Sequence, residues 1–358
     1  MLNIKENVSL KDLTTFKIGG LARFFTEAKT EEEVIEALTF AEEKNVPTYV
    51  LGDGSNVLVS DKGFPGLVLA VAIKGLRTIE KEKTVTAIVG AGNEWDGFVD
   101  FCVRKDWAGI ECLSGIPGKI GGAPVQNIGA YGQSVHETIT EVKVIEIKTR
   151  TPKVLKNDDC GFSYRKSIFN TTEKGKYIVT SVTFHLKPHS EPTVTYQDLI
   201  NWFVDPIKNP RGKKPTLEKV RQATLEIRSG KGLLKGNYQN AGSFFKNVII
   251  REDQFKKIEE IVLREKEGKP GCCGGKWNWE EKDGKRKIAT ACLVHCAGFA
   301  PGTRDGKVGT SPKQTLAVTN FDDASAEEVM QFVEKIRSTV KSKFGVQIEI
   351  EPELVGFE

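Results

Sequence analysis

Residues Ser114–Gly132 read SGIPGKIGGAPVQNIGAYG and contain six glycines and two prolines in nineteen positions. This density disfavours the interior of a helix or a strand, because glycine loses the most backbone entropy on folding and proline lacks an amide donor. Such a segment is either a linker or a backbone surface shaped around a ligand. A linker would be polar and rich in serine, whereas apolar residues interrupt this one at Ile116, Ile120, Val125 and Ile128. We therefore favour ligand contact.

A second glycine-rich segment, Leu51–Leu58 (LGDGSNVL), follows the apolar run at 48–51. Backbone amides in such a turn can hold a pyrophosphate, and Ser55 and Asn56 offer further donors. A hairpin turn that binds nothing is an equally good interpretation of this segment alone. No G-x-G-x-x-G opens a helix here, and the Gly-Lys pair at 118–119 is followed by Ile120 where a P-loop has Ser or Thr.

Helices and strands alternate around these segments. Thr30 with Glu33, and Ser325 with Glu328, form capping boxes before apolar stripes of helical spacing, and Gly345 ends the last helix. We also expect helices at 94–105 and 216–228, strands at 48–51, 68–73, 85–89, 142–147, 177–184 and 346–351, and an insertion loop at 265–287. The mixture indicates an α+β or α/β protein.

Two further segments carry candidate catalytic side chains. In Asn240–Asn247 (NAGSFFKN), Ser243 stands between a glycine and two phenylalanines, where its hydroxyl can donate a proton in a dry pocket. Spacing alone favours a simpler turn that the two phenylalanines anchor in a core. In Gly161–Phe169, Arg165 lies among aromatic residues and can polarise a carboxylate, although a structural ion pair is the default interpretation.

Composition excludes several classes of protein. The 358 residues suit two or three domains, and 39% hydrophobic with 28% charged residues is ordinary for a soluble globular protein. A net charge of +4 permits an anionic small molecule but is too small for a nucleic-acid partner. No apolar run of membrane-spanning length occurs, and the charged first residues are unlike a signal peptide. We therefore expect a cytoplasmic protein.

The seven cysteines are odd in number and scattered, which indicates reduced thiols. Cys272 and Cys273, with Cys292, His295 and Cys296, match no usual zinc spacing, so we expect buried helical thiols, a loop pair and no metal.

Seven segments, in order, closely resemble the MurB family, the UDP-N-acetylenolpyruvoylglucosamine reductases: 15–20, 51–58, 116–132, 162–169, 195–199, 240–247 and 351–353. The resemblance implies an α+β protein with a VAO/PCMH-type FAD-binding fold of two subdomains and a C-terminal α+β substrate domain. Residues 1–75 with 346–358 would form the first subdomain, 76–230 the second, and 231–345 the substrate domain. It also implies non-covalent FAD, NADPH as reductant, UDP-GlcNAc-enolpyruvate as substrate and a monomer.

The resemblance assigns the site residue by residue. Ser243 is similar to the family's proton donor, and Arg165 and Glu353 to the residues that stabilise charge on the substrate carboxylate. Substrate contacts are implied for Tyr196, on the extra loop of one family branch, and for Lys231, Asn247 and Gln314. FAD contacts are implied for Gly52, Gly54, Ser55, Asn56, Ile116, Pro117, Gly118, Gly121, Gly122, Gln126, Asn127, Gly129, Ala130 and Tyr131.

The chain departs from the family pattern at Val248, where proline is usual, and in segment 287–298, which lacks a tryptophan. Two rival functions remain at this stage. Another VAO-type oxidoreductase would often tether FAD through His or Cys, and no histidine is expected near either flavin loop. A non-catalytic nucleotide-sugar binder would not need Ser243, Arg165 and Glu353 together.

Overall fold

A computed structural model describes residues 2–210, 212–266 and 277–357, and these form two compact units. Unit 1 consists of Met1–Val8, Ala22–Asp53 and Phe64–Gly230, and unit 2 of Ser9–Leu21, Gly54–Gly63 and Lys231–Glu358. Each unit is described by itself. The three-part division expected from the sequence stays a prediction.

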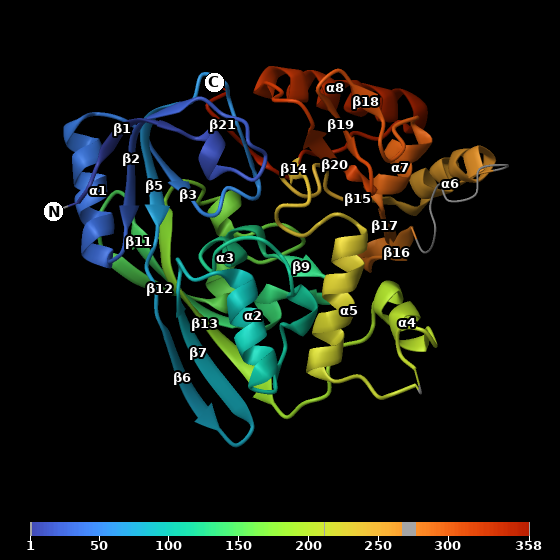
Figure 1. The fold of residues 1–358 in the computed structure, drawn as a ribbon, viewed down its shortest axis with the longest axis horizontal. Helices are drawn as coiled ribbons and strands as arrows, with labels where there is room; N and C mark the ends of the chain where they lie inside the picture. Colours follow the sequence, from blue (N-terminus) through green and yellow to red (C-terminus); the bar gives the residue numbers. More distant parts are fainter. Residues whose placement is uncertain (1, 211, 267–276, 358) are drawn as a thin grey trace. The chain divides into compact units, whose positions relative to one another are not determined.

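The first sheet of unit 1 has the strand order β1-β2-β5-β3, in which β5 runs parallel to both β2 and β3. Helix α1 packs on this sheet, where Val34, Ala37 and Leu38 join Leu67 and Leu69 in one apolar cluster (Figure 1). The elements are β1 Lys5–Ser9, β2 Leu21–Ala28, α1 Glu31–Glu43, β3 Thr48–Leu51 and β5 Phe64–Val71.

The second sheet of unit 1 is antiparallel, with the order β12-β11-β13-β7-β6, and β8 pairs with the end of β13. Helix α2 lies against it through Trp95 and Phe98, whose ring centroids are 6.1 and 5.0 Å from that of Phe184. The elements are β6 Leu76–Lys81, β7 Thr84–Gly90, α2 Trp95–Arg104, β8 Trp107–Ala108, α3 Gly122–Gln126, β9 Gly129–Ala130, β10 Gln133–Ser134, β11 Ile139–Glu146, β12 Pro152–Lys156, β13 Tyr177–Pro188, α4 Gln197–Val204 and α5 Leu217–Gly230.

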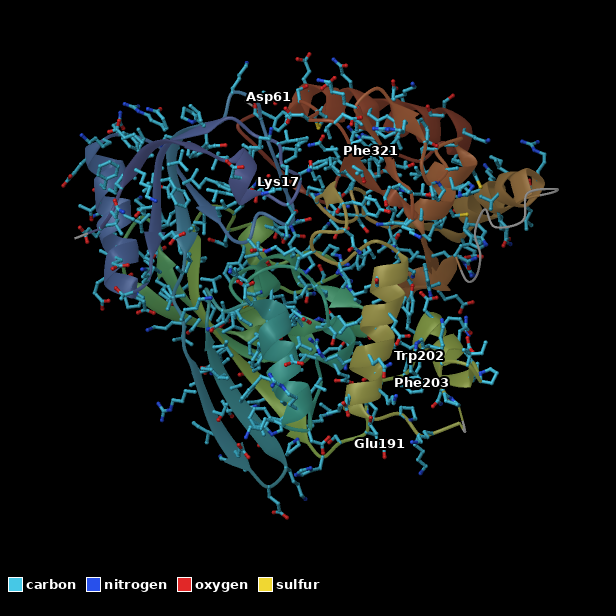
Figure 2. The ribbon with its side chains drawn as sticks, in the orientation of Figure 1. Lys17, Asp61, Glu191, Trp202, Phe203 and Phe321 are labelled. Carbon is cyan, nitrogen blue, oxygen red and sulfur yellow. The ribbon has the colours of Figure 1, made fainter. Side chains whose placement is uncertain are left out.

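Helix α4 is held beside α5 by Leu199 and Trp202, which share an apolar cluster with Val220 and Ala223. Trp202 is buried, its ring meets that of Phe203 at 5.0 Å, and its indole N–H donates to Glu226 on α5 at 2.7 Å. Figure 2 shows both rings on this helix. The indole bond satisfies a donor that burial would otherwise leave unpaired, so α4 is fixed beside α5.

Unit 2 contains three small sheets, with the strand orders β14-β20-β19-β18, β15-β17-β16 and β21-β4. One apolar core joins them to helices α6, α7 and α8 and includes Phe16, Phe244 and Phe332. The elements are β4 Val57–Val59, β14 Gln239–Asn240, β15 Val248–Arg251, α6 Glu252–Lys266, β16 Asn278–Glu280, β17 Lys285–Ile288, α7 Thr290–Cys296, β18 Arg304–Asp305, β19 Val308–Ser311, β20 Gln314–Asn320, α8 Ala326–Phe344 and β21 Glu353–Val355.

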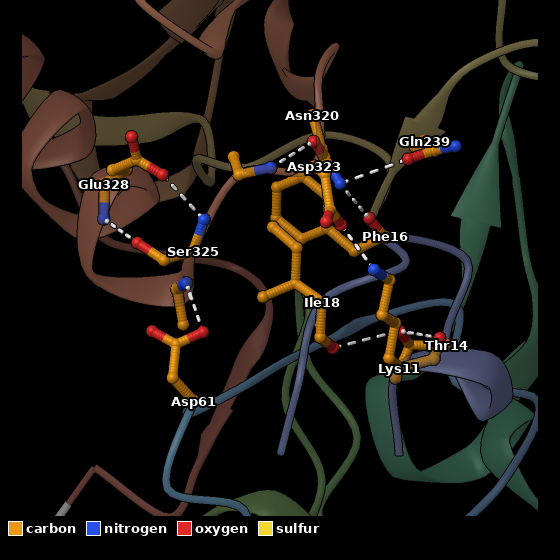
Figure 3. A network of polar contacts seen from close by, with 12 residues as sticks. Lys11, Thr14, Phe16, Ile18, Asp61, Gln239, Asn320, Asp323, Ser325 and Glu328 are labelled. Atoms are coloured by element: carbon orange, nitrogen blue, oxygen red, sulfur yellow. Dashed lines mark hydrogen bonds and ion pairs between the residues drawn. The ribbon is translucent and has the colours of Figure 1, made fainter. Parts of the chain in front are cut away.

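Polar contacts fix the segment 11–18 against the rest of unit 2 (Figure 3). The amide of Asn320 donates to the carbonyl of Phe16 at 3.2 Å and to Gln239 at 3.1 Å. At the N-terminus of α8, the Asp61 carboxylate accepts from the backbone amides of Ala326 at 2.9 Å and Glu327 at 3.2 Å. A carboxylate stabilises the positive end of a helix.

The capping predictions hold for α8 and partly for α1. Ser325 and Glu328 make both bonds of the capping box, and Gly345 adopts φ +68° as the C-cap. At α1, the Thr30 hydroxyl accepts from the Glu33 amide, but the Glu33 carboxylate accepts from the amide of Lys29 rather than that of Thr30.

Two structural expectations are wrong, and one open alternative is excluded. Residues 346–350 form no strand: burial alternates there, but only one bridge, Ile350 with Phe245, joins them to a neighbour, and the strand β21 starts at Glu353, after Pro352. The segment expected as the 265–287 loop contains β16 and most of β17, while Cys272 and Cys273 lie outside the described residues. The Leu51–Leu58 segment is not a hairpin turn, because β3 pairs with β5 and β4 pairs with β21.

The mixture of parallel and antiparallel sheets with helices confirms the α+β class. Across the described ranges, no helix is both long and apolar enough to cross a membrane.

Candidate functional site

The glycine-rich segment of unit 1 is more ordered than its composition suggests. It contains the short helix α3, contrary to the expectation of no helix. Gly121 is required for packing, because an added Cβ would lie 2.9 Å from the Cβ of Ala91. Gly122 differs: it is exposed, and an added Cβ would meet nothing within 4 Å. The absence of a side chain at Gly122 leaves exposed backbone that a ligand can approach, although the Gly122 amide itself donates to the Lys119 carbonyl at 3.0 Å.

Asn127 ends α3 in the left-handed conformation, with φ +42°. Its amide nitrogen donates to the Ser163 carbonyl at 2.7 Å, and its Oδ1 accepts from the Ser134 hydroxyl at 3.1 Å and lies 3.2 Å from Nδ1 of His136. Both ends of this side chain are therefore bound within the protein. The position of His136 also corrects the expectation that no histidine lies near a flavin loop, since it contacts one directly.

Arg165 belongs to the same cluster. Its guanidinium donates to the carbonyl of Gly129 at 3.0 Å and lies 5.4 Å from the ring centroid of Tyr164. Its backbone is left-handed (φ +55°), and its carbonyl accepts from the Asn170 amide at 3.1 Å. The turn therefore aims a half-buried cation at the edge of the glycine-rich segment.

A second guanidinium, Arg228, lies nearby in the interior of unit 1. It is only 8% exposed and donates to the Gly115 carbonyl at 3.1 Å. Burial lowers its pKa, and the proximity of Arg165 acts in the same direction, whereas Tyr131 and Asp96 oppose them. Two buried or half-buried cations in one region create a positive field that suits an anionic ligand.

Tyr131 and Tyr196 meet at right angles, with ring centroids 5.5 Å apart. Burial raises the pKa of Tyr131 to about 12, although Arg228 counteracts the effect, so the phenol stays neutral at physiological pH. Tyr196 is the N-cap residue of α4. The extra loop therefore brings its tyrosine to the end of the glycine-rich segment.

Sequence reasoning missed Arg228, although a signal was present. The buried face of α5 is Leu217, Val220, Ala223, Thr224 and Arg228. A charged residue at helical spacing on an apolar stripe is unusual, and it indicates a partner or a ligand.

In unit 2, the turn at Gly54 is closely packed. Gly54 has φ +63°, and an added Cβ would lie 2.1 Å from the carbonyl oxygen of Leu13. Only glycine fits this position. Gly52, which belongs to unit 1, is exposed and an added Cβ there would meet nothing within 4 Å.

Ser243 lies in the connection from β14 to β15. Gly242, with φ +75°, donates its amide to the Asn240 side chain at 2.9 Å and tightens the turn before the serine. Phe244 and Phe245, directly after it, are completely buried. The turn with a phenylalanine anchor is thus confirmed, and it leaves Ser243 half-buried at the edge of the core.

Hydrogen bonds connect Ser243 to Glu353 and Asn56 through the backbone. The carbonyl of Phe244 accepts from the amide of Glu351 at 2.9 Å, and the amide of Glu353 donates to the carbonyl of Asn56 at 3.0 Å. Unit 2 therefore brings three of the sequence-predicted site residues into one network.

The sequence-predicted substrate residues of unit 2 are less uniform. The Asn247 side chain accepts from the Thr290 amide at 3.1 Å and so caps the start of α7. Gln314 opens β20, and its Nε2 is buried and finds no hydrogen-bond partner among the residues that the structure describes. Lys231 is half-buried at the start of the last segment of unit 2.

The site residues fit a flavin dinucleotide. Gly52 and Gly122 expose backbone that no side chain covers, and the left-handed glycines Gly54 and Gly118 turn the chain within the same two segments. Backbone amides in such turns bind diphosphates.

No group of three or more metal-ligating side chains occurs in the described part of the chain. Cys292 and Cys296 are buried on a helix, α7, as expected. Cys102, Cys112 and Cys160 are free, but Cys292 is disulfide-bonded, so the expectation of reduced thiols is wrong at this residue.

Two family models match the chain. Residues 22–150 match the FAD binding domain, and residues 235–355 match the C-terminal domain of UDP-N-acetylenolpyruvoylglucosamine reductase. Curated UDP-N-acetylenolpyruvoylglucosamine reductases are similar over nearly their full length. That of Thermobifida fusca is 35% identical and covers 98% of both chains. That of Salinispora arenicola is 37% identical and covers 97% of this chain and 94% of its own.

Solved structures agree on the fold. The MurB of Thermus caldophilus has a TM-score of 0.64 at 24% identity and covers 99% of this chain and 100% of its own. A p-cresol methylhydroxylase has a TM-score of 0.51 at 12% identity, covering 98% of this chain and 86% of its own. The VAO/PCMH-type fold is thereby confirmed.

Proposed function

Because this chain belongs to the UDP-N-acetylenolpyruvoylglucosamine reductase family, we propose how its residues divide the reduction of the enolpyruvyl group among them. The enzyme is an FAD-dependent oxidoreductase that uses NADPH and acts in peptidoglycan precursor synthesis. FAD, when bound, supplies the redox chemistry. The chain supplies binding, orientation, charge and a proton.

The two glycine-rich segments hold FAD in this proposal. Residues 52–56 would bind the diphosphate through backbone amides, and residues 116–131 would hold the flavin ring. The uncovered backbone at Gly122 and the tight turn at Gly54 support this assignment. Asn127 contributes by its backbone, since its side chain is already bound to Ser163 and Ser134. The full set is Gly52, Gly54, Ser55, Asn56, Ile116, Pro117, Gly118, Gly121, Gly122, Gln126, Asn127, Gly129, Ala130 and Tyr131.

Ser243 is the proton donor. Reduction of the enolpyruvyl group leaves negative charge on the carbon that bears the carboxylate, and the product forms only when a proton reaches that carbon. A serine hydroxyl is a weak acid in water, but fixed geometry against a strongly basic carbon makes the transfer effective. The anchored turn between Gly242 and Phe244 supports this role, because it restricts where the hydroxyl can lie.

Arg165 stabilises the negative charge that develops on the substrate carboxylate, and Glu353 acts beside it as the neighbouring acid that donates a hydrogen bond. The Arg165 guanidinium is already oriented by its bond to the Gly129 carbonyl, and the Asn170 side-chain amide fixes the Arg165 backbone by donating to its carbonyl. Preorganised charge of this kind lowers a barrier more than a mobile side chain does, because the enzyme need not reorganise during the reaction.

Four residues hold the rest of the substrate: Tyr196, Lys231, Asn247 and Gln314. The buried Nε2 of Gln314, which has no hydrogen-bond partner within the described ranges, supports this for one of them, since a buried donor without a partner is costly until a ligand accepts from it. Lys231 offers a cation for the diphosphate. The enzyme works as a cytoplasmic monomer in this proposal, and size-exclusion chromatography with light scattering checks the oligomeric state.

The family relationship over nearly the full length of both chains is the observation that carries the function. The test follows the flavin colour of the purified protein without oxygen. NADPH should bleach the flavin band, and UDP-GlcNAc-enolpyruvate should restore it with formation of UDP-N-acetylmuramate.

The same experiment tests the rival functions. A VAO-type oxidase would be bleached by a sugar or an alcohol and recoloured by oxygen instead. A nucleotide-sugar binder would bind the substrate without a change of colour.

A further inference from the structure

The segment Thr15–Gly20 resembles the family but has no role in the site as described so far. Thr15 precedes the buried Phe16, whose ring lies 6.2 Å from that of Phe244. The atoms nearest to a Cβ added at Gly54 belong to Leu13 and Thr14, the two residues before Thr15. Thr15 therefore lies on the inner side of the diphosphate turn and close to the anchor of the serine turn.

Thr15 is bonded to both turns. Its hydroxyl lies 2.7 Å from the carbonyl oxygen of Asn240 and 3.3 Å from that of Gly54. Its backbone amide donates to the same Gly54 oxygen at 3.0 Å. A hydroxyl has one hydrogen, so the shorter distance identifies Asn240 as the main acceptor, and the amide secures the bond to Gly54.

These bonds close a circuit. From Gly54 the chain reaches Asn56, whose carbonyl accepts from Glu353 at 3.0 Å. The backbone amide of Glu351, two residues before Glu353, donates to the carbonyl of Phe244 at 2.9 Å. Phe244 directly follows the turn that begins at Asn240. Thr15 completes the circuit, because its hydroxyl is bonded to Asn240 and its amide to Gly54. The Thr15–Asn240 bond is the one member of this circuit made by a side-chain donor, so it can be removed by substitution while the backbone stays intact.

We propose that Thr15 is a positioning residue that holds the Ser243 turn in register with the FAD diphosphate turn. The inference rests on the proposed function, because only that function requires a constant separation between the proton donor and the turn that binds the cofactor. A shift of about 1 Å in a reacting group can slow a reaction about a hundredfold. Thr15 itself touches no reacting atom in this proposal.

The experiment compares Thr15→Val with Thr15→Ser. Valine matches threonine in shape but lacks the donor, whereas serine keeps it. Both variants are saturated with FAD. In Thr15→Val, recolouring by UDP-GlcNAc-enolpyruvate should slow by about tenfold or more, while bleaching by NADPH stays within about threefold of wild type. Thr15→Ser should restore recolouring to within about threefold of wild type.

A second readout does not depend on catalysis. Hydrogen exchange of the flavin-free protein should become faster by at least about threefold in peptides that cover 240–245 in Thr15→Val but not in Thr15→Ser, because the serine turn loses its tether. Equal recolouring and equal exchange in the two variants would overturn the proposal.

The wild-type enzyme serves as the control that distinguishes failure of this inference from failure of the proposed function. If substrate does not recolour the wild-type enzyme, the proposed function fails, and the exchange experiment still decides whether Thr15 tethers the turn. If Thr15→Val does not fold, Thr15→Ala removes the same hydroxyl donor without adding a branched methyl group. Thr15→Ala should then slow recolouring selectively and speed exchange in 240–245, and wild-type recolouring with wild-type exchange in that variant would contradict the proposed circuit.

Discussion

Glu111 holds the loop that carries Tyr196 within unit 1. Substitution of Glu111 tests this role through the loss in the free energy of unfolding. The residue is 1% exposed, yet it carries a carboxylate. Its two oxygens accept three hydrogen bonds, all at 2.8 Å, from the Gly109 amide, the Gln133 side chain and the Thr193 amide. Thr193 begins the segment that leads to Tyr196, so the carboxylate ties this segment to the end of the glycine-rich region.

The magnitude follows from these three donors. Glu111→Ala leaves them buried without an acceptor, at about 1 to 3 kcal/mol each. The penalties are not additive, because water can enter the space, so we expect a loss of about 4 kcal/mol in the free energy of unfolding. Glu111→Gln keeps one acceptor oxygen but turns an amide donor toward one of the three donors, which should cost about 2 kcal/mol.

Urea unfolding followed by circular dichroism measures these losses. Glu137→Gln, an exposed neighbour, is the matched control and should change stability by less than about 0.5 kcal/mol. The KM for the UDP-sugar should also rise in Glu111→Gln, since Tyr196 loses its support, while bleaching by NADPH persists. A midpoint for Glu111→Ala equal to that of the control would refute the reasoning.

Three further predictions concern the site and its frame. Ser243→Ala should leave bleaching by NADPH intact and slow recolouring by at least about a hundredfold, with Ser338→Ala as control; equal loss in both half-reactions would exclude the donor role. Glu353→Gln should show the same asymmetry in stopped-flow absorbance. The pKa of Asp96 is lowered, because hydrogen bonds from Arg221 and Gly115 outweigh the effect of its burial. The ionised Asp96 therefore stabilises the fold fully above the pKa of an unfolded aspartate, about 4, and this stabilisation is lost as the pH falls below that value. Asp96→Asn should flatten the acid part of the curve of unfolding free energy against pH, measured in acid titrations.

The sequence correctly predicted helix ends that are fixed by residues close to one another in the chain. Ser325, Glu328 and Gly345 fix both ends of α8 by contacts within a few residues, and Thr30 does the same for the start of α1. These bonds are independent of distant parts of the chain, so a pattern suffices to find them. The short helix α3 of the glycine-rich segment was not foreseen, because a single helical turn held by surrounding contacts has no periodicity to detect.

Errors arose where distant segments decide the outcome. Residues 346–350 alternate in burial as a strand would, yet the ladder that forms is β21 with β4, because Val57–Val59 is available as a partner there. The same pairing removes the hairpin interpretation of the turn after β3. Arg228 and Glu111 were missed for a related reason: each is a charged residue that burial makes important, and burial depends on the whole fold.

Unit 2 takes segments from three parts of the chain, 9–21, 54–63 and everything from 231 onward, and its strand β4 finds its partner only at Glu353–Val355. During translation, the ribosome must therefore pass Val355 before β4 can pair. Unit 1 needs nothing beyond Gly230 and can fold earlier, as domains generally do. A product truncated just before β21 would leave β4 with an unpaired edge, which chaperones and proteases recognise, so quality control can discard incomplete copies that lack Glu353.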